Sequence, residues 1–181
     1  MLRPPALAAA LLALAFACPA QTKVPHARTP AKPEPTEPEL AEYIRGQLLA
    51  LSPSDSINDN TEVTYNADTR VLTVTGPSGR CETSLPALNA NALVWDLYDP
   101  SDTDRTREKL LRLTFVSVSG KTARTCYDAQ GRVNSLMPTN RARFLFSESH
   151  ADETPDFQKK MAKAFQKLIA LTGGTPQKDL F

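Results

Sequence analysis

A series of short β-rich segments separated by turn residues constrains the fold of this 181-residue chain most strongly. The segments carry β-branched, aromatic or aliphatic residues, and clusters of Gly, Pro, Asp or Ser stand between them. Strands joined by short turns pair antiparallel, because parallel strands need long crossover connections. The predicted strands span residues 62–66, 70–75, 80–85, 93–98, 109–118, 122–127 and 141–147.

For two of these strands, the sequence also predicts which side chains are buried. The strand around Trp95 alternates, so Leu93, Trp95 and Leu97 are expected on its buried face. In the longest strand, Val116 and Val118 break the alternation by following the register of the other face. A bulge, or burial on both faces, is therefore expected there.

One helix is predicted on each side of the strands. The first spans residues 37–51, with Thr36 as its cap and Glu39 completing a capping box. The second follows the last strand, with Thr154 as its cap and Pro155 at its first position. It carries one apolar stripe, which comprises Phe157, Met161, Ala164, Phe165, Leu168 and Leu171.

The order of these elements predicts one α+β domain over residues 38–174. It contains about seven short antiparallel strands, an N-terminal helix and a C-terminal amphipathic helix packed on them. In element order alone, this resembles a pleckstrin-homology-like (PH-like) barrel. The alternative is a curved open sheet packed on two helices, cystatin-like in general plan.

The N-terminal residues predict export. Arg3 precedes an apolar run at residues 6–17, and small residues follow, as in a secretory signal peptide ending at Ala20. The run of about twelve residues is shorter than the roughly 20 that a membrane-spanning helix needs. A second interpretation is open, because Ala15-Phe16-Ala17-Cys18 resembles a bacterial lipobox. It would make Cys18 a lipid anchor, although Ala15 and Phe16 depart from the family pattern.

The residues beside the predicted domain lack the pattern of a packed core. Residues 21–37 are rich in proline and charge, which predicts an extended linker after the signal peptide of residues 1–20. The tail at residues 175–181 is expected to be loose.

Two cysteines remain after processing, whichever route applies. Cys81 and Cys126 form an even pair in an oxidising compartment, which predicts a disulfide. A disulfide between them would close a loop of about 45 residues and stabilise the fold by about 4 kcal/mol. The alternative is two buried free thiols.

Charge and motifs exclude several functions. The chain has 21 basic and 20 acidic residues, and removal of the leader with Arg3 leaves a neutral protein. This argues against a nucleic-acid binder, which shows a basic excess. Gly120-Lys121-Thr122 matches only the end of a P-loop and lies at an expected hairpin turn.

No cofactor is predicted, and the catalytic candidates are few. Acidic residues gather between Asp96 and Asp104, where a solvated turn is expected and a calcium-type site is the alternative. His26 falls in the linker, and His150 is expected in an exposed loop, so neither suggests a catalytic base.

The predicted function is that of an exported, periplasmic or secreted, non-catalytic binding module of the bacterial cell envelope. Its partner is an unidentified protein or envelope component, and membrane contact is expected only through Cys18. The alternative is a secreted enzyme or enzyme inhibitor. The candidate interaction residues are basic residues of the last helix and tyrosines at strand ends, namely Lys159, Lys160, Lys163, Lys167, Tyr98 and Tyr127.

Overall fold

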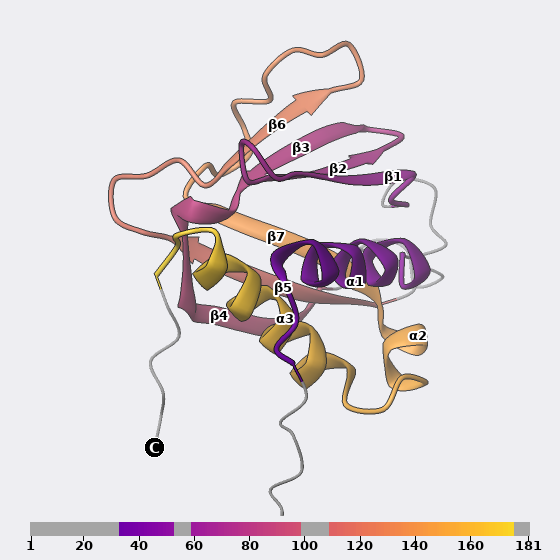
Figure 1. Ribbon diagram of the computed structural model, residues 1–181. Coiled ribbons are helices and arrows are strands. Elements are labelled where there is room, and N and C mark those ends of the chain that lie inside the picture. The colour runs from indigo at the N-terminus through magenta and orange to yellow at the C-terminus, as the bar shows by residue number, and fades with distance from the viewer. Residues whose placement is uncertain (1–32, 53–58, 99–108, 176–181) are drawn as a thin grey trace, which may run out of the picture. The chain divides into compact units, whose positions relative to one another are not determined.

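The strands of the chain form two antiparallel sheets (Figure 1). The computed structural model describes residues 33–52, 59–98 and 109–175, and all described helices and strands belong to the unit Glu34–Phe181. The predicted signal peptide, most of the linker and Cys18 lie outside the described residues. The elements are α1 (Glu37–Ala50), β1 (Glu62–Asn66), β2 (Val71–Gly76), β3 (Gly79–Ser84), the 3-10 turn η1 (Leu85–Ala87), β4 (Leu88–Tyr98), β5 (Leu110–Ser117), β6 (Arg124–Asp128), β7 (Arg141–Ser147), α2 (Glu148–Asp152) and α3 (Phe157–Leu171).

The predicted α+β class with seven antiparallel strands is confirmed, and the PH-like barrel is wrong. Sheet A has the strand order β1-β2-β3-β6 and sheet B the order β4-β5-β7; within the described residues neither closes on itself. The reason is the pairing of β6, which lies beside β3 and not beside β5 as a simple hairpin order implies. The η1 turn takes the chain from sheet A to sheet B, and β6 returns it to sheet A.

The hydrophobic core lies where the two long helices meet the sheets. Helices α1 and α3 contact each other, α3 packs on β4, and α1 contacts both β1 and β7 (Figure 1). Phe165 of α3 is fully buried, with its ring centroid 4.7 Å from that of Phe144 and 5.3 Å from that of Phe115. Ile44 and Leu48 of α1 are also fully buried, so both helices contribute to one core.

Helix α1 begins as the sequence predicts. The backbone N–H of Thr36 donates to Glu39 Oε2 over 2.7 Å, and the Thr36 hydroxyl donates to the same oxygen over 2.8 Å. These contacts place the Glu39 carboxylate at the positive end of the helix dipole. The helix ends at Ala50, one residue before the predicted end.

The predicted start of the last helix is wrong. Helix α3 starts at Phe157, and its cap is Asp156, which has a left-handed backbone with φ of 57°. Thr154 instead donates its hydroxyl to the His150 carbonyl, 3.3 Å away. The reason is α2, a short helix that the sequence did not predict, because Thr154 lies in the turn that follows it.

The buried stripe of α3 differs from the prediction at its C-terminal end. Leu171 is 45% exposed, whereas Ile169 is fully buried. The other five predicted stripe residues are buried. Ile169 lies beside Gly174, in the turn after the helix, and belongs to the core cluster, so the buried surface of α3 includes Ile169 and not Leu171.

Strand β4 corrects two expectations. Leu93 and Trp95 pack against the core, but Leu97 is 56% exposed. Trp95 already contacts Phe157, the first residue of α3, so Leu97 projects past the start of that helix. The bulge expected in the strand predicted at residues 109–118, which is β5, is instead in β4, where the register shifts between Leu88 and Leu93. Strand β5 pairs with β7 without a break.

Gly79 at the β2–β3 turn gives the first testable prediction. Its φ is 132°, and a Cβ at this position would lie 2.0 Å from the Tyr127 carbonyl oxygen of the neighbouring strand β6. Gly79→Ala is therefore expected to lower the free energy of unfolding by about 3 kcal/mol, as measured by urea denaturation.

Gly131→Ala is the matched control for Gly79→Ala. Gly131 also has a positive φ, 78°, but a Cβ there would meet no atom within 4 Å. Its expected cost is about 1 kcal/mol. Equal losses in the two variants would contradict the proposed clash between Gly79 and β6.

Candidate functional site

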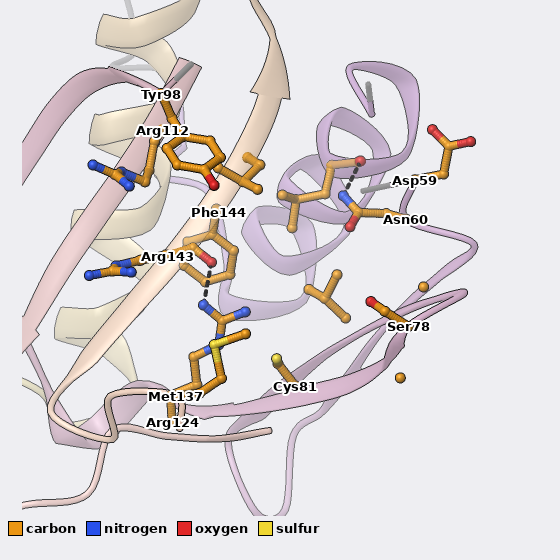
Figure 2. A pocket seen from close by; sticks show the side chains of 15 residues that line it. Asp59, Asn60, Ser78, Cys81, Tyr98, Arg112, Arg124, Met137, Arg143 and Phe144 are labelled. Atoms are coloured by element: carbon orange, nitrogen blue, oxygen red, sulfur yellow. Dashed lines mark hydrogen bonds between the residues drawn. The ribbon is translucent and has the colours of Figure 1, made fainter. Parts of the chain in front are cut away.

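A cavity of about 300 Å³ lies between sheet A and the β7 side of sheet B (Figure 2). The β2–β3 hairpin and β6 contribute its sheet A side, and β5 and β7 contribute its sheet B side. Its volume is at the small end of the range for ligand sites. The lining residues are Leu48, Asp59, Asn60, Val74, Gly76, Ser78, Gly79, Cys81, Tyr98, Arg112, Arg124, Met137, Arg143, Phe144 and Leu145.

Arg124 of β6 is the most unusual residue of this cavity. Its Nη1 donates to the Arg143 carbonyl oxygen over 2.7 Å, and its Nε is buried with no hydrogen-bond partner (Figure 2). Burial, and to a lesser degree the neighbouring charge of Arg143, lower the pKa of Arg124 to about 10. The side chain is thus still a cation at neutral pH, but it is held in surroundings that disfavour its charge.

Arg112 and Arg143 share one face of sheet B. Arg112 pairs with Leu145 across the β5–β7 ladder, and Arg143 lies two residues from Leu145 on β7. Arg112 donates two hydrogen bonds to Asp96, from Nε to Oδ1 over 2.9 Å and from Nη2 to Oδ2 over 2.5 Å. These bonds lower the pKa of the Asp96 carboxyl.

The charge of the cavity is positive. Arg112 is neutralised by Asp96, but none of the ion pairs among the described residues includes Arg124 or Arg143. Asp59 is the sole carboxylate among the described lining residues. The cavity is therefore suited to an anion, because a negative group would offset the charge of Arg124, which has no acidic partner in the described fold, and that of Arg143, which Asp96 offsets only at a distance.

The predicted disulfide is present beside this cavity. Cys81 of β3 and Cys126 of β6 are directly opposite each other, with Cα atoms 4.0 Å apart. Cys81 lines the cavity. The disulfide thus joins the strand that carries Arg124 to the rest of sheet A.

The two predicted tyrosines lie in different places. Tyr98 is 38% exposed and lines the cavity, with its ring centroid 5.0 Å from Cζ of Arg112. Tyr127 contacts Arg80 on β3, at 4.4 Å from ring centroid to Cζ, and its hydroxyl donates to Glu82 over 3.4 Å. Tyr127 is not among the described lining residues of the cavity.

The predicted lysines lie on α3, away from the lining of the cavity. Lys159, Lys160 and Lys163 are exposed, whereas Lys167 forms an ion pair with Glu34 at 2.5 Å. A basic surface on α3 for an anionic partner stays a prediction.

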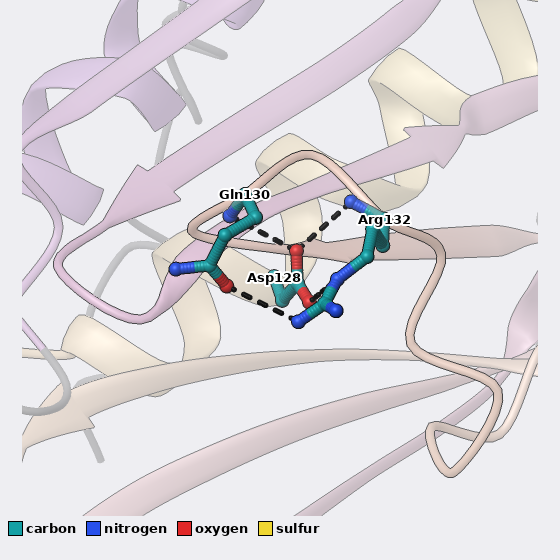
Figure 3. Close-up of polar contacts among 3 residues, drawn as sticks. All are labelled: Asp128, Gln130 and Arg132. Atoms are coloured by element: carbon teal, nitrogen blue, oxygen red, sulfur yellow. Dashed lines mark hydrogen bonds and ion pairs between the residues drawn. The ribbon is translucent and has the colours of Figure 1, made fainter.

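The turn after β6 satisfies its own charges (Figure 3). Asp128 Oδ1 accepts the backbone N–H groups of Gln130 and Arg132 over 3.0 and 2.9 Å, and Oδ2 accepts from Arg132 Nε over 2.8 Å. The bond from the Arg132 backbone is the largest of the effects that lower the pKa of Asp128. Because its acceptors are filled locally, this carboxylate stabilises the turn.

The remaining chemical candidates do not form a second site in the described part of the chain. His150 is exposed on α2. No group of three or more His, Cys, Asp or Glu residues among the described residues could hold a metal ion. Of the acidic segment from Asp96 to Asp104, Asp96 is engaged by Arg112, and residues 99–108 lie outside the described residues.

The sequence interpretation missed the three cavity arginines. Arg112 and Arg143 lie between apolar residues of their predicted strands, as in Leu111-Arg112-Leu113, and Arg124 lies between Ala123 and Thr125. A charged residue inside such a strand is a recognisable signal, because it needs a partner or a ligand if it is buried. Which arginines meet depends on the pairing of the sheets.

Comparisons with known proteins identify no relative. No protein-family model matches the chain, and neither a curated protein nor a solved structure shows significant similarity to it. The geometry of the cavity is therefore the basis for assigning a function. Among the described residues, no helix is long and apolar enough to cross a membrane.

Proposed function

We propose that this chain is an exported, non-catalytic binding module of the bacterial cell envelope, with its ligand site in the cavity between the two sheets. The observation that carries this proposal is Arg124, a half-buried cation whose Nε is fully buried without a hydrogen-bond partner and which has no acidic partner in the described fold. A buried donor without a partner on a charged group is costly, so its presence favours a role in binding an anion.

Binding is favoured over catalysis by the residues that line the cavity. Among the described lining residues, Ser78 is the one serine or threonine that could act as a nucleophile, and none is a histidine that could activate it. Cys81 is in a disulfide and has no thiolate to offer. A secreted enzyme or enzyme inhibitor is the second candidate, and it would require groups beyond this described set.

Export is supported by two independent features. The first twenty residues have the layout of a signal peptide. The Cys81–Cys126 disulfide is a crosslink that persists in oxidising compartments such as the periplasm. We propose the periplasm or the extracellular medium as the working compartment, with Cys18 either removed or lipidated.

A cavity-filling variant tests the binding site. Ser78 is exposed at the β2–β3 turn and lines the cavity, so Ser78→Trp is expected to fill it and leave the core intact. Thermal unfolding is measured with a panel of carboxylates, phosphates, sugars, amines and short peptides. A ligand at 100 times its Kd is expected to raise the Tm of the wild type by about 5 °C or more and that of Ser78→Trp by much less.

Thr75→Trp is the matched control, because Thr75 lies on the same hairpin but does not line the cavity. It should respond to ligand as the wild type does. A compound that stabilises Ser78→Trp and the wild type equally binds elsewhere, and would contradict the proposed site. Chemical conversion of the bound compound would favour the enzyme alternative.

A further inference from the structure

We propose that the ligand is a small organic carboxylic acid whose carboxylate is held by Nε and Nη2 of Arg124, an inference that rests on the proposed function. It specifies the chemical group that the cavity recognises and the atoms that recognise it. Three observations lead to it: the unused donors of Arg124, the way Arg112 binds Asp96, and the apolar residues in the same cavity.

The unused donors of Arg124 lie along one edge of its guanidinium. A guanidinium has five N–H donors in a fixed planar fork. In Arg124, Nη1 is engaged by the Arg143 carbonyl, and this is the one side-chain hydrogen bond of Arg124 within the described structure. The Nε and Nη2 hydrogens that remain are parallel, and two parallel donors match the two coplanar oxygens of a carboxylate. Because Nε is covered in this structure, binding at both donors requires neighbouring side chains to move aside.

Other arginines of the protein already bind carboxylates through this edge, and one of them is Arg112 in the same cavity. Arg112 presents its Nε and Nη2 to the two oxygens of Asp96, and the two bonds are 2.9 and 2.5 Å long. Both arginines line the same cavity. The pair shows the geometry that we infer for Arg124 and an external carboxylate.

Electrostatics supports one negative charge at Arg124. The neighbouring Arg143 cation and burial both disfavour the charge of Arg124. A carboxylate would offset this repulsion. It also has a smaller dehydration cost than a doubly charged phosphate, because the cost of removing an ion from water rises steeply with its charge.

The apolar part of the ligand is set by the same cavity. Leu48, Val74 and Phe144 line it together with Met137, whose side chain is about half exposed. A volume of about 300 Å³ leaves room for a short hydrocarbon chain. Hexanoate is therefore a suitable probe, with hexan-1-ol and inorganic phosphate as matched comparisons for its chain and its charge.

The test follows the Arg124 Nε–H resonance by ¹H–¹⁵N NMR in the exported, disulfide-bonded wild type. Hexanoate is expected to shift this resonance saturably, whereas hexan-1-ol and inorganic phosphate at the same concentrations are expected to leave it unchanged. An equal response to hexan-1-ol would overturn the role of the carboxylate. Tighter binding of phosphate would overturn the choice of anion.

Variants test the fork directly. Arg124→Lys keeps the positive charge but loses the two parallel donors, so its Kd for hexanoate is expected to rise about tenfold or more. Arg141→Gln removes an exposed arginine of strand β7 that does not line the cavity, and the Kd of this variant for hexanoate should be unchanged. Equal weakening in both variants would show a general charge effect and contradict the proposal.

The outcomes also separate this inference from the proposed function. If Arg124→Lys does not fold, the titration of the wild-type resonance still decides. If hexanoate leaves the resonance unchanged but another class of compound stabilises the wild type and not Ser78→Trp, the carboxylate is wrong and the binding site stands. If no compound of the panel distinguishes those two proteins, both proposals are contradicted.

Discussion

Met161→Asp is expected to leave the domain unfolded at room temperature. Met161 is fully buried in the core stripe of α3. Truncating such a side chain costs about 2–5 kcal/mol, and an unpaired carboxylate in its place adds several kcal/mol more. The sum approaches or exceeds the total stability of about 5–15 kcal/mol that is usual for a domain. Far-UV circular dichroism and the fluorescence of Trp95 report the outcome.

Two comparison variants make the Met161 result interpretable. Lys163→Asp introduces the same residue on the same helix at an exposed position, so a loss below about 1 kcal/mol is expected. Met161→Ala removes the buried side chain without adding charge, and its urea transition should show a loss of about 2–5 kcal/mol. A folded Met161→Asp protein as stable as Lys163→Asp would show that α3 packs in another orientation.

Loss of the disulfide is expected to lower the free energy of unfolding by about 4 kcal/mol and the Tm by roughly 10 °C. The crosslink joins residues separated by 45 positions in the sequence. It restricts the unfolded chain, and it ties β6 to sheet A, in which β6 is an edge strand paired with β3. The double variant Cys81→Ala, Cys126→Ala is compared with the wild type by urea unfolding.

The control for the disulfide changes a neighbouring pair of the same two strands. Glu82 and Thr125 are directly opposite each other in the β3–β6 ladder. Glu82→Ala combined with Thr125→Ala should cost about 1 kcal/mol, because it removes side chains but no crosslink. Two alkylatable thiols in the exported wild type, measured by mass spectrometry without reductant, would show that the crosslink is absent.

The local elements were predictable because their signals lie within a few residues of one another. The contacts between Thr36 and Glu39 are an example, since cap and partner are three positions apart. The strands β1 and β7 have the predicted bounds for the same reason. The start of α3 was wrong because Thr154 had two local options, and the unpredicted α2 supplied its acceptor at His150.

The candidate site was predicted in part. Tyr98 was identified, and the structure places it at the cavity, while Arg112, Arg124 and Arg143 were missed. These arginines come from three strands, and Arg124 reaches the Arg143 carbonyl across a gap between two sheets. No spacing along the chain encodes that contact.

The sequence alone determined the seven strands of this protein and their antiparallel orientation, its two long helices, and the crosslink between Cys81 and Cys126. These features depend on hydrophobic periodicity, on capping and turn residues, and on the even number of cysteines that remain after processing. The tertiary structure decided that β6 pairs with β3, that the strands divide into two sheets, and that an uncompensated Arg124 faces the space between them. The physical reason is that several strand pairings bury similar apolar area, and the choice among them depends on how both helices and both sheets pack together.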